Sequence, residues 1–180
     1  MGAPGSGGGA GAFLTRIKRG RGRSRKNVRV SRPGVGDGTG NEDGMRITDF
    51  SDLLTAARGQ PEPQRLLLVF TSAELPHDAT PAERAAFERG EGGALAPVLC
   101  VDKRPEEIES FDALCEESRR TGIGWDILFV GALSGRGGHA PNADEAVQPL
   151  RMMVEAIKAG RVAQFLAVNR DGDLVRLERG

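Results

Sequence analysis

The apolar positions of residues 45–180 follow two patterns in turn, a helical period and short continuous runs. Helices are predicted where apolar residues recur every three to four positions before a glycine, over 50–57, 81–89, 105–121 and 143–159. Strands are predicted where apolar residues run on without a break, over 66–70, 94–101 and 125–130. A final hairpin is predicted from 162–168 and 174–177, around the Asp-Gly turn at 169–173.

Two prolines and one apolar run add detail to this pattern. The run 66–70 is expected to be a strand that is covered on both faces. Pro97 indicates that the strand over 94–101 lies at a sheet edge or contains a bulge. Pro149 has to lie in or near the first turn of the last helix, or it will kink that helix.

The alternation of strands and helices predicts an α/β fold. Three strand-helix-strand crossovers would give one domain with a mostly parallel sheet of four to five strands, flanking helices and a C-terminal β-hairpin. The carboxyl ends of parallel strands lie on one rim, which is where such sheets bind ligands. That rim would gather Thr71 and Ser72, Asp102, Lys103 and Arg104, then Ser134, Arg136 and His139, and finally Asn169 and Arg170.

Residues 1–44 lack this pattern and hold thirteen glycines. They carry nine Lys or Arg against three Asp or Glu, while residues 45–180 carry sixteen against twenty-two. Such a segment is predicted to be disordered. It can be a basic arm that binds nucleic acid through 16–32, an inert tail, or translated sequence upstream of a true start at Met45. The abrupt beginning of the pattern at Met45 favours the last interpretation.

The composition narrows the class of protein. No run of eighteen apolar residues is long enough to span a membrane, and the N-terminus lacks the apolar core of a secretory signal. The acidic balance of 45–180 argues against nucleic-acid binding outside the tail. Cys100 and Cys115, like His77 and His139, lack the spacing of a metal site. We therefore expect a cytoplasmic protein with no metal and no cofactor.

The candidate chemistry lies in the glycine-rich stretch 131–139, between the strand over 125–130 and the last helix. Its glycines would let backbone N–H groups approach an anion, and Arg136 adds a planar cationic donor. The predicted ligand-binding residues are Ser134, Gly135, Arg136, Gly137, Gly138 and His139, with Asp102 and Lys103 across the rim. The stretch has neither the nucleotide P-loop ending nor the dinucleotide-binding pattern, so a plain surface loop is the competing interpretation.

Catalytic interpretations have weaker support. Ser134, His139 and Asp102 could form a nucleophile, base and orienting acid, but the sequence around Ser134 is not that of a nucleophile elbow. Glutamates on the helix over 105–121 fit a solvated face better than a metal site. No catalytic residue is predicted, and an enzymatic function is disfavoured without being excluded.

Five stretches of the chain carry a resemblance to a known family: QPEPQR at 60–65, ELP at 74–76, GEGGA at 90–94, CVDK at 100–103 and WDILFVGALSGR at 125–136. On these, nearly all of 45–180 resembles a small bacterial protein family, mostly from proteobacteria, whose members are often labelled "ribonucleotide reductase subunit alpha". The catalytic large subunit of that enzyme needs a ten-stranded barrel and several redox cysteines. Two cysteines cannot fill those roles, so the resemblance implies a reductase-associated accessory protein at most.

The sequence thus leaves two hypotheses for a protein of unknown function. The first is a small binding module that holds an anionic metabolite or a nucleotide phosphate at 131–139. The alternative is a protein-interaction or accessory protein that binds no small ligand.

Overall fold

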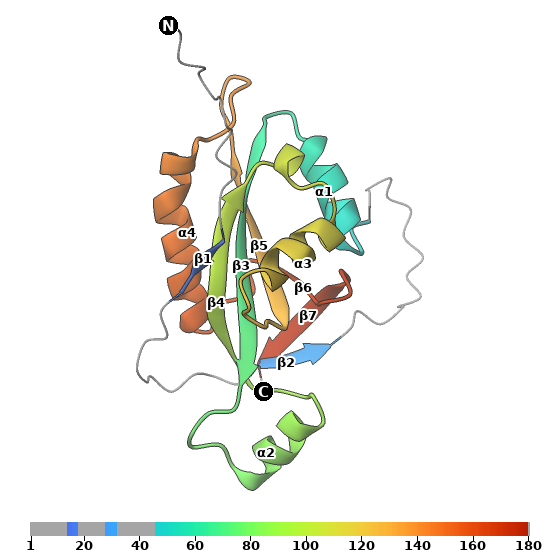
Figure 1. Ribbon diagram of the computed structural model, residues 1–180, viewed down its shortest axis with the longest axis vertical. Coiled ribbons are helices and arrows are strands. Elements are labelled where there is room, and N and C mark those ends of the chain that lie inside the picture. The colour runs from blue at the N-terminus through green and yellow to red at the C-terminus, as the bar shows by residue number, and fades with distance from the viewer. Residues whose placement is uncertain (1–13, 18–27, 32–45, 180) are drawn as a thin grey trace, which may run out of the picture.

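An antiparallel sheet forms the middle of the molecule (Figure 1). The computed structural model describes residues 14–17, 28–31 and 46–179. Seven strands lie in the order β1-β4-β3-β5-β6-β7-β2, and each pairs antiparallel with its neighbours. Their bounds are Thr15–Arg16 for β1, Val28–Ser31 for β2, Gln64–Glu74 for β3, Ala94–Lys103 for β4, Ile127–Ser134 for β5, Leu166–Val168 for β6 and Leu174–Arg179 for β7.

The predicted parallel sheet is therefore wrong. The helix between β3 and β4, α2 (Pro81–Glu88), does not cross the sheet but extends the tip of a β3–β4 hairpin, away from the body of the molecule (Figure 1). It has no buried residue. The strands β4 and β5 do run in the same direction, but β3 lies between them and opposes both. A helix between two strands does not fix their relative direction, because the helix can sit at the end of the sheet instead of on its face.

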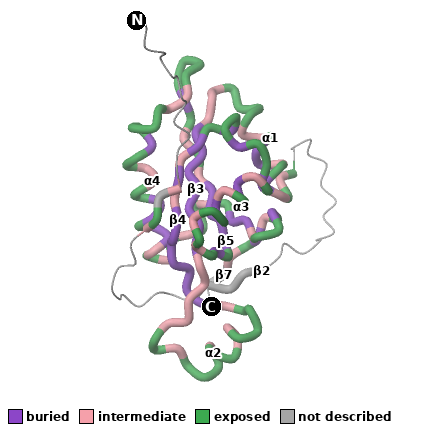
Figure 2. Tube along the Cα trace, in the orientation of Figure 1, coloured by how far each residue is buried: buried purple, intermediate pink, exposed green. Residues whose placement is uncertain are grey.

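Two helices cover one face of the sheet and a third covers the other (Figure 1). The first pair is α1 (Phe50–Arg58) and α3 (Phe111–Arg119), and the third is α4 (Ala143–Lys158). Side chains of β3 alternate between the two cores: Leu66, Leu68 and Phe70 pack with α1 and α3, and Leu67 and Val69 pack with α4. The expectation that 66–70 is covered on both faces is confirmed (Figure 2).

The predictions of individual helices, strands and turns agree with the structure more closely than the predicted strand directions do. The helix predicted over 81–89 is present and begins with a capping box of Thr80 and Glu83, and the predicted hairpin of β6 and β7 closes around 169–173. Pro97 stands beside a bulge, since the register of β4 against β3 shifts there. The helix predicted from Pro105 is interrupted: a 3-10 turn, η1 (Pro105–Glu107), precedes α3. Pro149 lies inside α4, beyond its first turn.

Two strands belong to the segment that the sequence predicts to be disordered. β1 pairs with β4 and β2 pairs with β7, so each lies at one edge of the sheet. The structure describes these two short strands within 1–44. The rest of 1–44, including most of the basic stretch 16–32, lies outside the described residues, and there the prediction of disorder stays untested.

None of the helices in the described part of the chain combines the length and apolarity that a membrane span requires.

Candidate functional site

The glycine-rich stretch forms the end of β5 and a tight turn. β5 continues through Ser134, and Arg136 and His139 then exchange both backbone hydrogen bonds, with N···O distances of 3.0 and 3.1 Å. Gly137 and Gly138 stand between them with φ angles of 58° and 81°. A two-residue turn of this hand needs positive φ at both central positions, which glycine supplies at little cost. These two glycines therefore serve the turn.

Gly135 has a different role, which is close packing. A Cβ atom at this position would stand 2.1 Å from the carbonyl oxygen of His139 and 2.7 Å from that of Pro63. The Gly135 N–H donates to the same Pro63 oxygen at 2.8 Å. Only a residue without a side chain fits between these two backbone segments.

The segment that enters β3 supports the turn through three neighbouring contacts. The Glu62 carboxylate accepts from the Gly138 N–H at 2.8 Å, and the Gln64 amide donates to the Ser134 hydroxyl at 3.1 Å. Pro63 supplies the carbonyl that holds Gly135. The pairing of β3 with β5 places these residues side by side, with Gln64 opposite Ser134.

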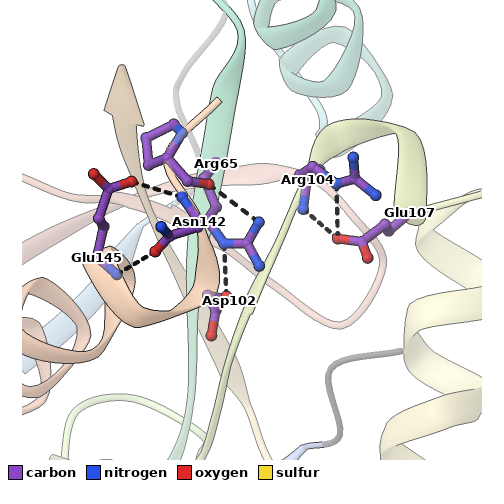
Figure 3. A network of polar contacts seen from close by, with 7 residues as sticks. Arg65, Asp102, Arg104, Glu107, Asn142 and Glu145 are labelled. Carbon is purple, nitrogen blue, oxygen red and sulfur yellow. Dashed lines mark hydrogen bonds and ion pairs between the residues drawn. The ribbon is translucent and has the colours of Figure 1, made fainter. Parts of the chain in front are cut away.

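A buried ion pair lies behind the turn (Figure 3). The Arg65 Nε donates to the Asp102 Oδ2 at 2.7 Å, and the side chains are 9% and 17% exposed. The same guanidinium donates through Nη1 to the Pro141 carbonyl at 3.3 Å. Arg65 thus links β3, β4 and the connection that leads from the turn into α4.

The start of α4 is closed by a reciprocal capping box (Figure 3). The Glu145 N–H donates to the Asn142 Oδ1 at 2.8 Å, and the Asn142 N–H donates to the Glu145 Oε2 at 2.7 Å. This arrangement satisfies two N–H groups at the helix start, which have no partner within the helix.

An open groove of about 510 Å³ lies between the turn and the start of α4. Within the described residues, the exposed side chains of Arg136 and His139 have no hydrogen-bond or ion-pair partner. The groove is lined by Leu133, Ser134, Gly135, Arg136, His139, Ala140, Pro141, Asn142, Glu145 and Pro149.

Of the eight predicted ligand-binding residues, Ser134, Gly135, Arg136 and His139 line this groove. Gly137 and Gly138 form the tip of the turn. Asp102 stands behind the groove, paired with Arg65. Lys103 does not line the groove. Its Nζ lies 3.1 Å from the Glu117 carboxylate, on the face of the sheet that α3 covers. Adjacent strand residues point to opposite faces, so Asp102 and Lys103 cannot serve one site on one face.

Three other residues of the predicted rim, Thr71, Asn169 and Arg170, lie elsewhere, because the sheet is antiparallel and not parallel. Because β3 opposes β4 and β5, Thr71 lies at the end of the sheet where β5 begins, opposite Ile127. Asn169 follows β6, whose last residue pairs with Leu128 near the start of β5. Arg170 stacks on Trp125 there, 5.8 Å from the ring centroid. These residues are remote from the groove.

The geometry does not support a catalytic triad. The Asp102 carboxylate is bonded to Arg65, and no hydrogen bond joins the side chains of Ser134 and His139. Within the described residues, no three His, Cys, Asp or Glu side chains are grouped so that they could hold a metal ion.

The two cysteines are also poorly placed for redox or nucleophilic chemistry. Cys115 belongs to the core beneath α1 and α3, while Cys100 packs against the core on the α4 side. Burial raises the pKa of the Cys100 thiol, and the nearby charge of Asp102 raises it further. Burial also raises the pKa of Cys115. Both are therefore thiols at neutral pH, on opposite sides of the sheet, and neither is an activated nucleophile.

Glu62 and Arg65 are the functional candidates that the sequence reasoning missed. Both stand just before the apolar run of β3, as Asp102 stands at the end of β4. Charged residues next to a buried strand are a weak sequence signal. They indicate a site here only once β3 is known to lie between β4 and β5.

Comparisons with protein-family models, with curated proteins and with solved structures found no match to this chain, so the family resemblance stays a prediction.

Proposed function

We propose that this protein binds a small ligand through a phosphate or carboxylate group in the groove between the Arg136–His139 turn and α4. The observation that carries the proposal is the exposed Arg136 guanidinium, which lines a groove of suitable size and has no partner within the described residues. A planar guanidinium can donate two parallel hydrogen bonds to either kind of anion.

Side chains supply the binding groups in this proposal, because the backbone of the turn is largely occupied. The N–H groups of Gly135, Arg136 and His139 donate to carbonyl oxygens, and that of Gly138 donates to Glu62. The glycine-rich backbone thus shapes the turn and presents Arg136 and His139, whereas the sequence suggested that its N–H groups would surround the anion.

The alternative function, an interaction protein without a small ligand, has one observation in its favour. The helix α2 projects from the body at the tip of the β3–β4 hairpin, and none of its residues is buried (Figure 2). Binding of a small anion distinguishes the two functions.

The test is the melting temperature of the full chain in sodium phosphate, in sodium acetate and in sodium chloride of equal ionic strength. Binding to the native state raises the melting temperature by about 3–5 °C at a ligand concentration ten times Kd. We expect Arg136→Ala to lose the rise, and Arg120→Ala to keep it, because Arg120 is exposed at the end of α3 on the other face of the sheet. Equal melting temperatures in all three salts would overturn the proposal and favour the interaction protein.

A further inference from the structure

The groove presents two opposite charges at separate places. Among its lining residues, Arg136 carries a guanidinium and Glu145 a carboxylate, and no ion pair joins them. Arg136 comes from the turn, whereas Glu145 lies in the first turn of α4, and both residues line the groove. A ligand in the groove can therefore meet both charges.

The Glu145 carboxylate can accept further hydrogen bonds in addition to the one that caps α4. Its Oε2 receives the Asn142 N–H, while Oε1 has no partner within the described residues. A carboxylate offers about four lone-pair positions, so the capping bond leaves most of them open. The residue is exposed, and its free oxygen can accept from an ammonium group of a ligand.

Apolar residues also line the groove, although its polar surface is the larger part. Leu133, Ala140, Pro141 and Pro149 stand among the charged and amide groups of the wall. These four residues can contact a short aliphatic chain, whose methylene groups gain free energy when they leave water.

We propose that the ligand is zwitterionic: a short aliphatic amine whose other end carries a phosphate or carboxylate group. The anionic end binds Arg136, and the ammonium end donates to Glu145. This inference rests on the proposed function and deepens it, since it names the class of ligand for the same groove. A simple anion would gain Arg136 but would also meet the repulsion of Glu145.

The test compares two matched pairs of probes on the full chain by calorimetric titration. O-phosphoethanolamine is set against ethyl phosphate, and β-alanine against propionate; the members of each pair differ by the amino group. One exposed ion pair is worth a factor of about two to five in affinity, so the amine-bearing member should bind more tightly by that factor. Ethylamine alone tests whether the cation suffices.

Glu145→Gln is the decisive variant. Glutamine can keep the capping bond to the Asn142 N–H, so the melting temperature without ligand should fall only slightly, through the lost interaction of the charge with the helix dipole. We expect this variant to bind both members of a pair equally. Asp144→Asn is the matched control: Asp144 is exposed in the same helical turn but does not line the groove, so the preference for the amine should persist.

The outcomes separate this inference from the proposed function. If wild type binds both members of each pair equally, and Arg136→Ala abolishes binding of both, the zwitterionic ligand is wrong and the anion site stands. A preference that survives Glu145→Gln would also overturn the role of Glu145. If no probe binds at millimolar concentration, both proposals fail together.

Discussion

Arg65 and Asp102 join the two strands β3 and β4 by a buried ion pair, with 2.7 Å between Nε and Oδ2. The same guanidinium holds the Pro141 carbonyl, so the pair connects the sheet to the chain segment that forms one wall of the groove. It thereby links the stability of the fold to the shape of the candidate site.

Asp102→Ala should destabilise the protein, because it leaves the Arg65 charge buried without a counter-ion. Removing one partner of a buried pair costs about 3–5 kcal/mol, and the partial exposure of Asp102 places the expected cost near the lower end, at about 3 kcal/mol. Urea denaturation followed by the fluorescence of Trp125 gives the measurement. The control is the double variant Arg65→Met with Asp102→Leu, which removes both charges and should cost less than the single change. A double variant as unstable as the single one would show that the unpaired charge is not the cause.

Gly135→Ala should be far more harmful than Gly124→Ala. A Cβ at Gly135 would stand 2.1 Å from a backbone oxygen, whereas one at Gly124 would meet nothing within 4 Å. Forcing atoms into such a site costs about 3 kcal/mol, the upper part of the usual range, while the change at Gly124 should stay within about 0.5 kcal/mol. The free energies of unfolding of the two variants, measured side by side, check this. Similar values would mean that the Gly135 backbone moves away freely.

The thiols of Cys100 and Cys115 should react slowly with iodoacetamide near neutral pH. Burial raises the pKa of both thiols, so the reactive thiolate is scarce, and the rate should rise about tenfold per pH unit through pH 9. The urea-unfolded protein is the control and should react faster at every pH in this range. A Cys100 that reacts at pH 7 faster than the unfolded chain would reverse our conclusion and support a nucleophilic role.

The raised pKa values also give a sign to the pH dependence of stability. The folded state favours the neutral thiol. The stabilisation that the two neutral thiols contribute to the folded state is therefore fully present below the unfolded pKa of about 8.5. This stabilisation should be lost as the pH rises above that value. Replacement of both cysteines by alanine should flatten the alkaline decline of the melting temperature, and an unchanged decline would assign it to other groups.

Removal of residues 1–44 should promote self-association. β1 and β2 lie at the two edges of the sheet, against β4 and β7, and an uncovered edge offers free N–H and C=O groups to another chain. Size-exclusion chromatography with light scattering should show larger species for 45–180 than for the full chain, increasing with concentration. If 45–180 stays a stable monomer, the two edge strands are not needed to prevent self-association.

Local features of this fold were within reach of the sequence. The capping box of α2, the covered run of β3 and the hairpin of β6 and β7 all depend on residues that are close together in the chain. The position of the candidate site was also predicted in part, because Ser134, Gly135, Arg136 and His139 do line one groove.

The strand directions could not be predicted from the same signals. The pattern of a strand, a helix and a strand is the same whether the helix lies on the sheet, as α4 does, or at the tip of a hairpin, as α2 does. What distinguishes them is burial: α4 buries five residues, while α2 buries none. The sequence of α2 hinted at this, since alanines make up most of its apolar positions and bury little area.

Most helices, strands and turns of 46–179 follow from the amino-acid sequence alone, because hydrogen bonds and side-chain contacts within a few residues decide them. The pairing of distant segments depends on the packing of the whole sheet. The insertion of β3 between β4 and β5 brought Glu62 and Arg65 to the turn, and the alternation along β4 sent Asp102 and Lys103 to opposite faces. Such partners depend on register and strand order, which arise from packing of the whole sheet and have no local signature.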